Sequence, residues 1–196
     1  MGKWFPMVYD VAMNPLEFIK LKRVRKLLVS QATGRVLEIG SGTGFNFPFY
    51  TNARQVDAIE PNPTMRNISM KRKVPTPIHT YLLGAEKLPF ADNTFDSVVA
   101  TLVFCTIPDP LQAIKELERV SKPGAKILVL EHVRLNNPLV GKAQDIVSPM
   151  WKKLCDGCHL NRNTVELVEQ SNLSIVNRST FYRGLFVQLE CVNEKT

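Results

Sequence analysis

Three glycines at alternate positions follow an apolar segment in residues 35–44 (RVLEIGSGTG). The residues Val36–Ile39 have the apolar character of a short buried strand. Gly40, Gly42 and Gly44 then allow positive φ angles and close approach of a ligand, because glycine has no Cβ atom. A strand, such a turn and a following helix form the nucleotide-binding corner of a doubly wound α/β sheet. The loop therefore predicts a site for a nucleotide-like ligand.

A carboxylate follows at a distance that suits such a site. A second apolar run, Val56–Ile59, ends directly before Glu60, about twenty residues after Gly40. At that spacing the acidic side chain lies at the tip of the neighbouring strand, within reach of the hydroxyl groups of a ribose. A glycine turn alone is also compatible with a tight turn that binds nothing. The strand, the glycines and the carboxylate occur together here, and their combination favours the ligand site.

The form of the loop narrows the choice of nucleotide. It reads G-x-G-x-G and is preceded by Glu38, whereas dinucleotide sites usually read G-x-G-x-x-G. The sequence also has no G-x-x-x-x-G-K-[ST] segment, so the phosphate cradle of an ATP or GTP site is not expected. The loop therefore differs from both common phosphate-binding patterns.

Two of the four cysteines lie in residues 155–159 (CDGCH), which fit the C-x-x-C-H pattern of c-type haem attachment. We do not expect haem, because residues 1–6 lack the features of an export signal. A zinc site would need further ligands, and Cys105 and Cys191 stand at no spacing that is typical of one. The spacing therefore predicts no metal site, with a redox pair of cysteines as the alternative.

The composition is that of an ordinary globular protein of one domain. The 196 residues are 44% hydrophobic and 22% charged, and this length allows one sizeable core. No apolar run approaches the roughly 18 residues that span a bilayer. Together with the N-terminal residues, this pattern predicts a cytoplasmic protein whose cysteines are reduced.

The net charge of +7 is concentrated toward the N-terminus. Residues 1–35 hold seven Lys and Arg side chains against Asp10 and Glu17, so this stretch contributes five of those charges. The simplest interpretation is a solvated face. Peripheral contact with an anionic membrane and contact with nucleic acid are the alternatives. The aromatic residues within 3–15 either pack on the surface of the domain or form a lid over the substrate pocket.

The hydrophobic pattern predicts strands that alternate with helices. After the first strand, we expect strands at residues 55–60, 78–83, 95–101, 125–131, 173–178 and 185–191. We expect helices at residues 16–29, from 45 onward, at 64–73, from 109 to the KPG stop at 122–124, at 138–155 with an interruption at Pro149, and at 164–170. The alternation predicts a doubly wound α/β fold with a parallel core sheet. Residues 1–33 are expected to form an N-terminal lid and helix, and residues 34–196 the main domain.

The ordered motifs of residues 34–135 resemble the class I S-adenosylmethionine (SAM) methyltransferases of the ubiquinone/menaquinone-biosynthesis-like group, also called methyltransferase type 11. Glu38 and the three glycines resemble motif I of that family. Residues 85–90 (AEKLPF), 95–99 (FDSVV) and 120–125 (VSKPGA) resemble its AExLPF, FDxVV and VLKPGG segments. The resemblance implies a Rossmann-like sheet of seven strands in the order 3-2-1-4-5-7-6, with strand 7 antiparallel. The predicted helix at residues 16–29 adds an N-terminal helical cap.

The same resemblance implies S-adenosyl-L-methionine as the methyl donor and S-adenosyl-L-homocysteine as the product. It implies that the glycine loop holds the methionine part, that Glu60 binds the ribose and that the backbone around Ala85 contacts adenine. Gly84 stands where many members have Asp, so one side-chain contact to adenine is missing. The implied donor-binding residues are Glu38, Gly40, Ser41, Gly42, Gly44, Asn46, Glu60, Pro61, Met65, Gly84, Ala85, Glu86, Thr101 and Leu102.

A narrower resemblance concerns residues 44–50 (GFNFPFY), 131–133 (EHV) and the later segment 149–164, which contains DGCHLNRNT. These segments resemble the animal methyltransferase-like thiol S-methyltransferases, whereas the core is also similar to bacterial phospholipid N-methyltransferases. We therefore expect a small-molecule or lipid-like acceptor: a phospholipid amine, a quinone precursor or a thiol. The sequence leaves the acceptor and the oligomeric state open.

Methyl transfer from a sulfonium requires alignment of the nucleophile and exclusion of water, and it requires a base only where the acceptor must lose a proton. His132 follows the fifth predicted strand, whose carboxyl end faces the ligand crevice, so it is the first candidate for that base. Asp156 is the second candidate. Cys105, His159 and Arg162 are further candidates, and each of these groups could instead be structural.

Two other functions are kept as alternatives. The chain could be a SAM-binding partner subunit without catalysis, or a nucleic-acid methyltransferase. The second is disfavoured, because residues 104–108 (FCTIP) lack an N/D-P-P-Y/F motif after the fourth predicted strand. The sequence also shows no appended nucleic-acid-binding domain.

Overall fold

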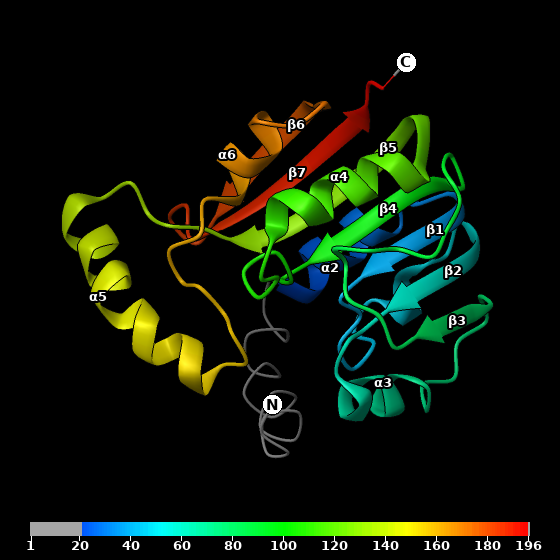
Figure 1. Ribbon diagram of the computed structural model, residues 1–196, viewed down its shortest axis with the longest axis horizontal. Helices are drawn as coiled ribbons and strands as arrows, with labels where there is room; N and C mark the ends of the chain where they lie inside the picture. Colours follow the sequence, from blue (N-terminus) through cyan, green and yellow to red (C-terminus); the bar gives the residue numbers. More distant parts are fainter. Residues whose placement is uncertain (1–20, 196) are drawn as a thin grey trace.

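Seven strands form one mixed sheet in the computed structural model, which describes residues 21–195 (Figure 1). In chain order they are β1 (Gly34–Ile39), β2 (Ala53–Ile59), β3 (Ile78–Tyr81), β4 (Phe95–Thr101), β5 (Ser121–His132), β6 (Leu173–Phe181) and β7 (Phe186–Asn193). The first five strands pair in parallel, and β7 runs antiparallel to both β5 and β6. The order β3-β2-β1-β4-β5-β7-β6 confirms the Rossmann-like topology that the sequence resemblance implied.

Helices cover both faces of this sheet. They are α2 (Lys22–Val29), α3 (Pro63–Ser69), α4 (Pro110–Val120), α5 (Pro138–Leu154) and α6 (Thr164–Glu169), with a 3-10 turn η2 (Phe47–Phe49). Residues of α4 and α6 pack into the core on one face, and residues of α2 and η2 pack into the core on the other. Figure 1 shows α5 standing apart from the sheet.

Alternate residues of the central strands belong to these two cores. In β4, Val98 and Ala100 pack beneath α4 and α6, while Val99 packs beneath α2. Successive side chains of a strand point to opposite faces, so a strand that is covered on both faces must be apolar throughout. This requirement explains the nearly continuous apolar run of β4.

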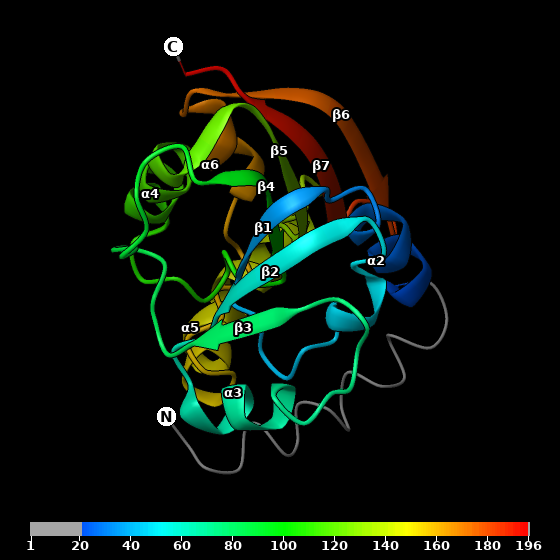
Figure 2. The ribbon, with the colours of Figure 1, turned by 90° about the vertical axis from the view of Figure 1, so that its right-hand side faces the viewer.

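The sheet order reverses between β1 and β4, which are neighbours in the sheet. Ligands of open α/β sheets bind at the carboxyl ends of the strands next to such a point. Gly40 directly follows β1, and Glu60 directly follows β2. Leu102 follows β4 at the same edge, and His132 ends β5. Figure 2 shows β1, β2 and β3 side by side at one end of the sheet.

The predicted first crossover helix from residue 45 onward is wrong. The structure has only the short turn η2 there, with Pro48 inside it. Proline lacks the backbone N–H that a continuing helix needs. The neighbouring Phe47 and Tyr50 are buried in the core beneath α2, so packing of these aromatic side chains fixes the segment instead.

The predicted interruption at Pro149 is also wrong, because α5 continues through it. Asn137 caps the start of α5, where its side chain accepts hydrogen bonds from the backbone of Leu139 and Val140. Helical bonding resumes after the proline, as the Cys155 N–H donates to the Trp151 carbonyl at 2.8 Å. In the described part of the chain, no helix is both long and apolar enough to cross a bilayer.

The N-terminal boundary was predicted at residue 33. The predicted lid and the first part of the helix at 16–29 lie outside the described residues. The described part, α2, packs Leu28 and Val29 into the same core as Val36 of β1. Helix α2 is therefore integrated into the main core.

Candidate active site

The glycine loop after β1 has the backbone conformation that its sequence predicted. Gly40, Gly42 and Gly44 have φ angles of 62°, 54° and 80°, a region that favours glycine. A Cβ atom on Gly40 would lie 2.1 Å from Cγ2 of Val103, so the loop passes directly against the segment after β4. The Ser41 N–H donates to the carbonyl of Ile59 at 3.0 Å and ties the loop to the end of β2.

The Glu60 carboxylate is buried beside this loop. Its Oε2 accepts a hydrogen bond from the Gly42 N–H at 2.9 Å, and its Oε1 accepts one from the Asn62 N–H at 2.8 Å. Burial raises the pKa of Glu60, and these two backbone bonds oppose the rise. Asn62 in turn caps α3, accepting from the N–H of Met65 at 3.3 Å. The carboxylate thus joins the glycine loop to the start of α3.

A network of buried polar side chains lies under the loop. The Asn46 amide donates to Glu38 Oε1 at 2.9 Å and to the Thr101 hydroxyl at 3.0 Å. Arg25 of α2 donates to the Asn46 side-chain oxygen and to the Thr101 hydroxyl, both at 2.8 Å. All four side chains are buried. The network connects β1, β4 and the loop, so it fixes three predicted site residues relative to one another.

Arg25 is a functional candidate that the sequence interpretation missed. Lys and Arg residues of this helix were expected on its exposed faces, but the Arg25 side chain is only 3% exposed. Its spacing from Leu21 and Leu28 places it on the apolar face of α2. That spacing was a signal available in the sequence, because a cation inside an apolar stripe needs a buried polar partner.

Two buried oxygen atoms beside the loop have no hydrogen-bond partner among residues 21–195: Ser41 Oγ and Glu38 Oε2. The Tyr50 hydroxyl lies near Glu38 but outside hydrogen-bond geometry. Buried polar atoms are usually satisfied, so these two oxygens are available to a ligand that carries hydrogen-bond donors. The ammonium group in the methionine part of SAM has such donors, and the loop therefore fits that ligand.

The carboxyl group of Glu38 predicts a pH dependence of stability. Burial raises its pKa from 4.5 to about 7, so the folded state keeps a proton that the unfolded chain releases. We expect the free energy of unfolding, measured without donor, to fall as the pH rises through that interval. Release of one proton on unfolding changes the free energy of unfolding by at most about 1.4 kcal/mol per pH unit.

Urea unfolding at pH values from about 5 to 8 measures this effect, and Glu38→Gln should flatten the dependence. Glu131 is also buried, with its pKa raised to about 7, but it is present in both proteins. The comparison therefore isolates Glu38. Equal slopes for the two proteins would contradict the assignment.

The other predicted donor-binding residues lie around the same edge. The Glu60 N–H donates to the Tyr81 carbonyl at 3.0 Å, which sets the end of β3 beside Glu60. Residues 84–86 follow, with Ala85 buried and Gly84 exposed. Met65 is buried at the start of α3, and Pro61 is exposed. The remaining positions are Glu86, whose carbonyl accepts from Gln112, and Leu102, whose φ is 53°.

His132 meets two cysteines at the end of β5. Its Nε2 lies 3.3 Å from Sγ of Cys158, and the ligand atoms of Cys105, His132 and Cys158 all lie within 4.8 Å of one another. Hydrogen bonding with Cys105 and then with His132 lowers the pKa of the Cys158 thiol well below its usual range. The sequence spacing gave no reason to group these residues, because three separate segments contribute them.

The segment 155–163 is tied to the turn after β4. The His159 N–H donates to the Cys105 carbonyl at 2.9 Å. The Arg162 guanidinium donates to the carbonyls of Phe104 and Ile107, the latter at 2.6 Å. On the opposite side, Glu131 Oε1 accepts from the backbone N–H of Val103 at 2.6 Å. The turn that carries Cys105 is therefore held from both β5 and the 155–163 segment.

Asp156, the second predicted base, lies elsewhere in the site. It has a positive φ of 48°, and its charge is one of the influences that raise the pKa of Glu60. Among residues 21–195, no hydrogen bond links Asp156 to His132. The structure thus brings His132 to the cysteines and Asp156 toward the Glu60 side, so the two predicted bases do not form a pair.

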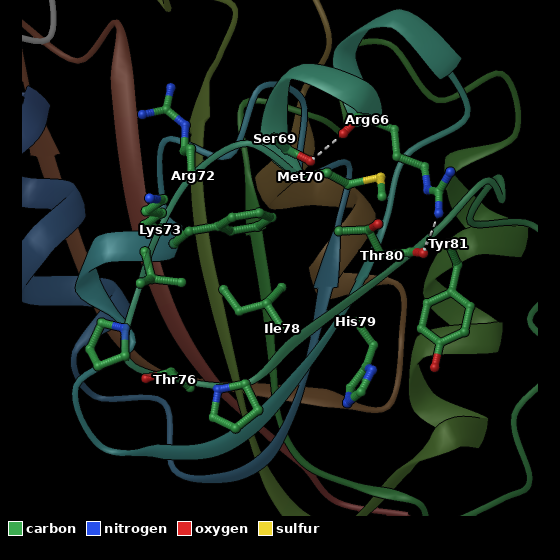
Figure 3. A pocket seen from close by; sticks show the side chains of 14 residues that line it. Arg66, Ser69, Met70, Arg72, Lys73, Thr76, Ile78, His79, Thr80 and Tyr81 are labelled. Atoms are coloured by element: carbon green, nitrogen blue, oxygen red, sulfur yellow. Dashed lines mark hydrogen bonds between the residues drawn. The ribbon is translucent and has the colours of Figure 1, made fainter.

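A pocket of about 700 Å³ lies away from these groups, between α3 and the edge strand β3. Figure 3 shows Arg66, Arg72, Lys73 and His79 among the side chains that line it. Arg66 also donates to the Thr80 carbonyl at 2.9 Å. No predicted site residue lines this pocket. The chemistry-bearing groups therefore lie at the carboxyl edge of the sheet and not in this cavity.

Comparison with known proteins identifies the family of this chain. A family model described as a methyltransferase domain matches residues 37–129. The human thiol S-methyltransferase TMT1B is 32% identical over 87% of this chain and 75% of its own length, and the rat protein matches over 60% of its length. The phosphatidylethanolamine N-methyltransferase of Cereibacter sphaeroides is 27% identical over 79% of this chain and 81% of that protein.

A solved structure shows the same fold. The SAM-dependent methyltransferase of Thermotoga maritima aligns with 98% of this chain and 100% of its own, with a TM-score of 0.67 and 22% identity. The motifs, the strand order and these relatives agree with one another. The methyl donor that the sequence motifs imply is SAM, and the buried oxygens beside the glycine loop fit its ammonium group. The chain belongs to the class I SAM-dependent methyltransferases.

Proposed function

We propose that this methyltransferase transfers the methyl group of SAM to the sulfur atom of a small apolar thiol. The observation that carries the proposal is the position of the segment 155–163. This segment is hydrogen-bonded to the turn after β4 and covers the carboxyl ends of β4 and β5. This segment belongs to one of the three stretches whose sequence resembles thiol S-methyltransferases. The relatives of that name support the same acceptor.

We propose the following roles for the donor-binding groups. The backbone from Gly40 to Gly44 and the oxygens of Glu38 and Ser41 hold the methionine part, and Glu60 holds the ribose. Met65, Pro61 and residues 84–86 border the adenine. Thr101 and Leu102 lie beneath the methyl group, with Asn46 holding Thr101. The hydrogen bond from Gly42 to Glu60 supports this arrangement, because it joins the methionine and ribose subsites.

An exposed apolar face of α5 supports an apolar acceptor. Its exposed side chains are Leu139, Val140, Ile146, Val147, Met150, Trp151 and Leu154. The Trp151 side chain is also one of the groups that lower the pKa of the Cys158 thiol, so the C-terminal end of this face reaches the segment that carries the cysteine. An acceptor with an apolar tail could bury that tail against α5 while its sulfur reaches the donor.

A thiol acceptor must lose its proton before it attacks, because the thiolate is the nucleophile. His132 and Asp156 are the groups that we propose assist this step. A cytoplasmic location and contact with an anionic membrane stay predictions from the sequence. Three lysines of α5, Lys142, Lys152 and Lys153, are consistent with such a contact.

Transfer of a labelled methyl group from SAM tests the acceptor. We expect an alkyl thiol to be methylated at least about tenfold faster than the alcohol and amine of equal chain length, and faster than phosphatidylethanolamine in vesicles. The physical reason is the greater nucleophilicity of a thiolate at neutral pH.

A Gly42→Val variant supplies the inactive control. A β-branched residue is strongly disfavoured at the φ of 54° that Gly42 adopts. The thiol proposal is wrong if the wild-type protein methylates the alkyl thiol no faster than the Gly42→Val variant does, while it still methylates the phospholipid amine. Donor binding without transfer to any of these acceptors would instead favour a SAM-binding partner subunit.

A further inference from the structure

We propose that Cys105, His132 and Cys158 form a zinc site with three protein ligands and one open coordination position. The site lies at the carboxyl ends of β4 and β5, and the segment 155–163 covers it. Its ligands come from the turn after β4, the last residue of β5 and the loop after α5. Neither the donor-binding role nor the thiol proposal assigns a metal to these side chains.

The distances suit a tetrahedral zinc ion. With Zn–S bonds of about 2.3 Å and Zn–N bonds of about 2.0–2.1 Å, two ligand atoms of one tetrahedron lie about 3.5–3.8 Å apart. The Nε2 of His132 lies 3.3 Å from Sγ of Cys158, and all three ligand atoms lie within 4.8 Å of one another. The His132–Cys158 pair needs an adjustment of a few tenths of an ångström, and the two pairs that include Cys105 need a shift of about 1.3 Å at most, to bring the three atoms onto one ion.

The chemistry of the ligand set favours zinc over harder cations. Two thiolates and one imidazole suit Zn²⁺, whereas Mg²⁺ and Ca²⁺ prefer oxygen ligands. No carboxylate belongs to the group. Two cysteines and one histidine are also one of the ligand sets of catalytic zinc sites, in which the fourth coordination position is left for water or substrate.

The ligands stand on segments that the fold already holds together. The backbone of His159 bonds the carbonyl of Cys105 itself, at 2.9 Å, and so couples the segments of the two cysteines. Glu131 precedes His132 and accepts bonds from the N–H groups of Val103 and Phe104. Both contacts fix the backbone next to the ligands and use none of the three ligand atoms. The scaffold is therefore in place before an ion binds, which reduces the ordering cost of binding.

The open position gives the site a role in the reaction, and this part rests on the proposed thiol methylation. The acceptor thiol would bind as the fourth ligand and release its proton to solvent, because a thiol that coordinates zinc is deprotonated. His132 would then assist as a ligand through Nε2 and not as a free base.

The methyl transfer that follows forms one carbon–sulfur bond and breaks another. The acceptor sulfur forms a bond to the methyl carbon as the bond from that carbon to the sulfonium sulfur breaks. S-adenosyl-L-homocysteine leaves as a neutral thioether, and the thiolate becomes a thioether that binds zinc more weakly than the thiolate did. Weaker binding of the product favours its release.

Metal content of the full-length protein tests the site directly. We expect one zinc per chain by elemental analysis after purification with a phosphine reductant, and rebinding of one equivalent after chelation. Cys105→Ser and Cys158→Ser should each lower the affinity by at least about 100-fold, because even outer contacts of metal sites are worth 10–100-fold.

Cys155→Ser is the matched control. Cys155 belongs to the same C-x-x-C segment but lies outside the ligand group, so its replacement should leave the zinc content unchanged. No zinc in the wild-type protein, or equal loss in Cys155→Ser and Cys158→Ser, would overturn the site. Melting temperatures measured alongside show whether a variant lost zinc only by unfolding.

Cobalt substitution separates the site from its role without any variant. We expect Co²⁺ in the wild-type protein to give thiolate charge-transfer absorption typical of tetrahedral coordination. Addition of an alkyl thiol should shift this spectrum, and the matching alcohol should not. A cobalt spectrum that no thiol changes would overturn the role of the open position while the metal count still supports the site. Thiol methylation by a protein that binds no metal would overturn the site and leave the proposed function standing.

Discussion

Replacement of Gly40 by alanine is expected to lower the affinity for SAM by about tenfold to a hundredfold and to destabilise the fold. The φ of 62° is strained for alanine, which costs roughly 1–3 kcal/mol. The added Cβ would also lie 2.1 Å from Val103, and overpacking of this kind costs roughly a further 1–3 kcal/mol. Relief of the contact must move the loop away from Val103 and so disturb the Gly42–Glu60 bond. A tenfold change in affinity corresponds to about 1.4 kcal/mol of binding free energy. If displacement of the loop costs about 1–3 kcal/mol of that free energy, the affinity for SAM falls by about tenfold to a hundredfold.

Gly124→Ala is the control for this experiment. Gly124 also has a positive φ, of 74°, but a Cβ atom there would meet nothing within 4 Å. It lies at the start of β5, at the opposite end of that strand from His132. We therefore expect a comparable strain cost and an unchanged affinity for SAM, measured by titration calorimetry. A loss of affinity in Gly124→Ala equal to that in Gly40→Ala would contradict the steric account of the loop.

Arg25→Met is expected to destabilise the protein by roughly 3–5 kcal/mol, because the buried Asn46 oxygen and Thr101 hydroxyl each lose a hydrogen bond from a charged donor, worth about 1.5–3 kcal/mol. The variant removes the donors to Asn46 and Thr101 and the positive charge that lowers the pKa of Glu38. We also expect weaker SAM binding, since the same network sets the positions of Glu38, Asn46 and Thr101.

Lys26→Met and Arg25→Lys complete this comparison in urea unfolding and donor titration. Lys26 is the exposed neighbour in the same helix, so its loss should change stability by less than about 1 kcal/mol. Arg25→Lys keeps the charge but loses the planar fork that bonds two partners, so an intermediate effect is expected. If Arg25→Met and Lys26→Met show the same free energy of unfolding and the same affinity for SAM, the buried network contributes little to stability or to donor binding.

The donor half of the site was accessible from sequence because its signals are local. Glycines at alternate positions after an apolar strand require a particular turn, and Glu60 stands at the end of the next strand. The structure places these groups in contact through the bond from Gly42 to Glu60. The cluster of Cys105, His132 and Cys158 carries no such local signal. Cys105, His132 and Cys158 are separated by whole helices and strands, and only the pairing of β4 with β5 and the return of the loop after α5 bring them together.

The sequence by itself determined the strand pattern, the glycine loop and the acidic strand tip, because propensity, burial period and turn chemistry act between residues that are close along the chain. Tertiary packing decided the rest. It drew Phe47 and Tyr50 into the core in place of a helix, and it buried Arg25 against Asn46 and Thr101. It also closed the 155–163 segment over the end of β5. These features depend on burial of side chains against distant partners, and the free energy of such contacts exceeds local preference wherever the two conflict.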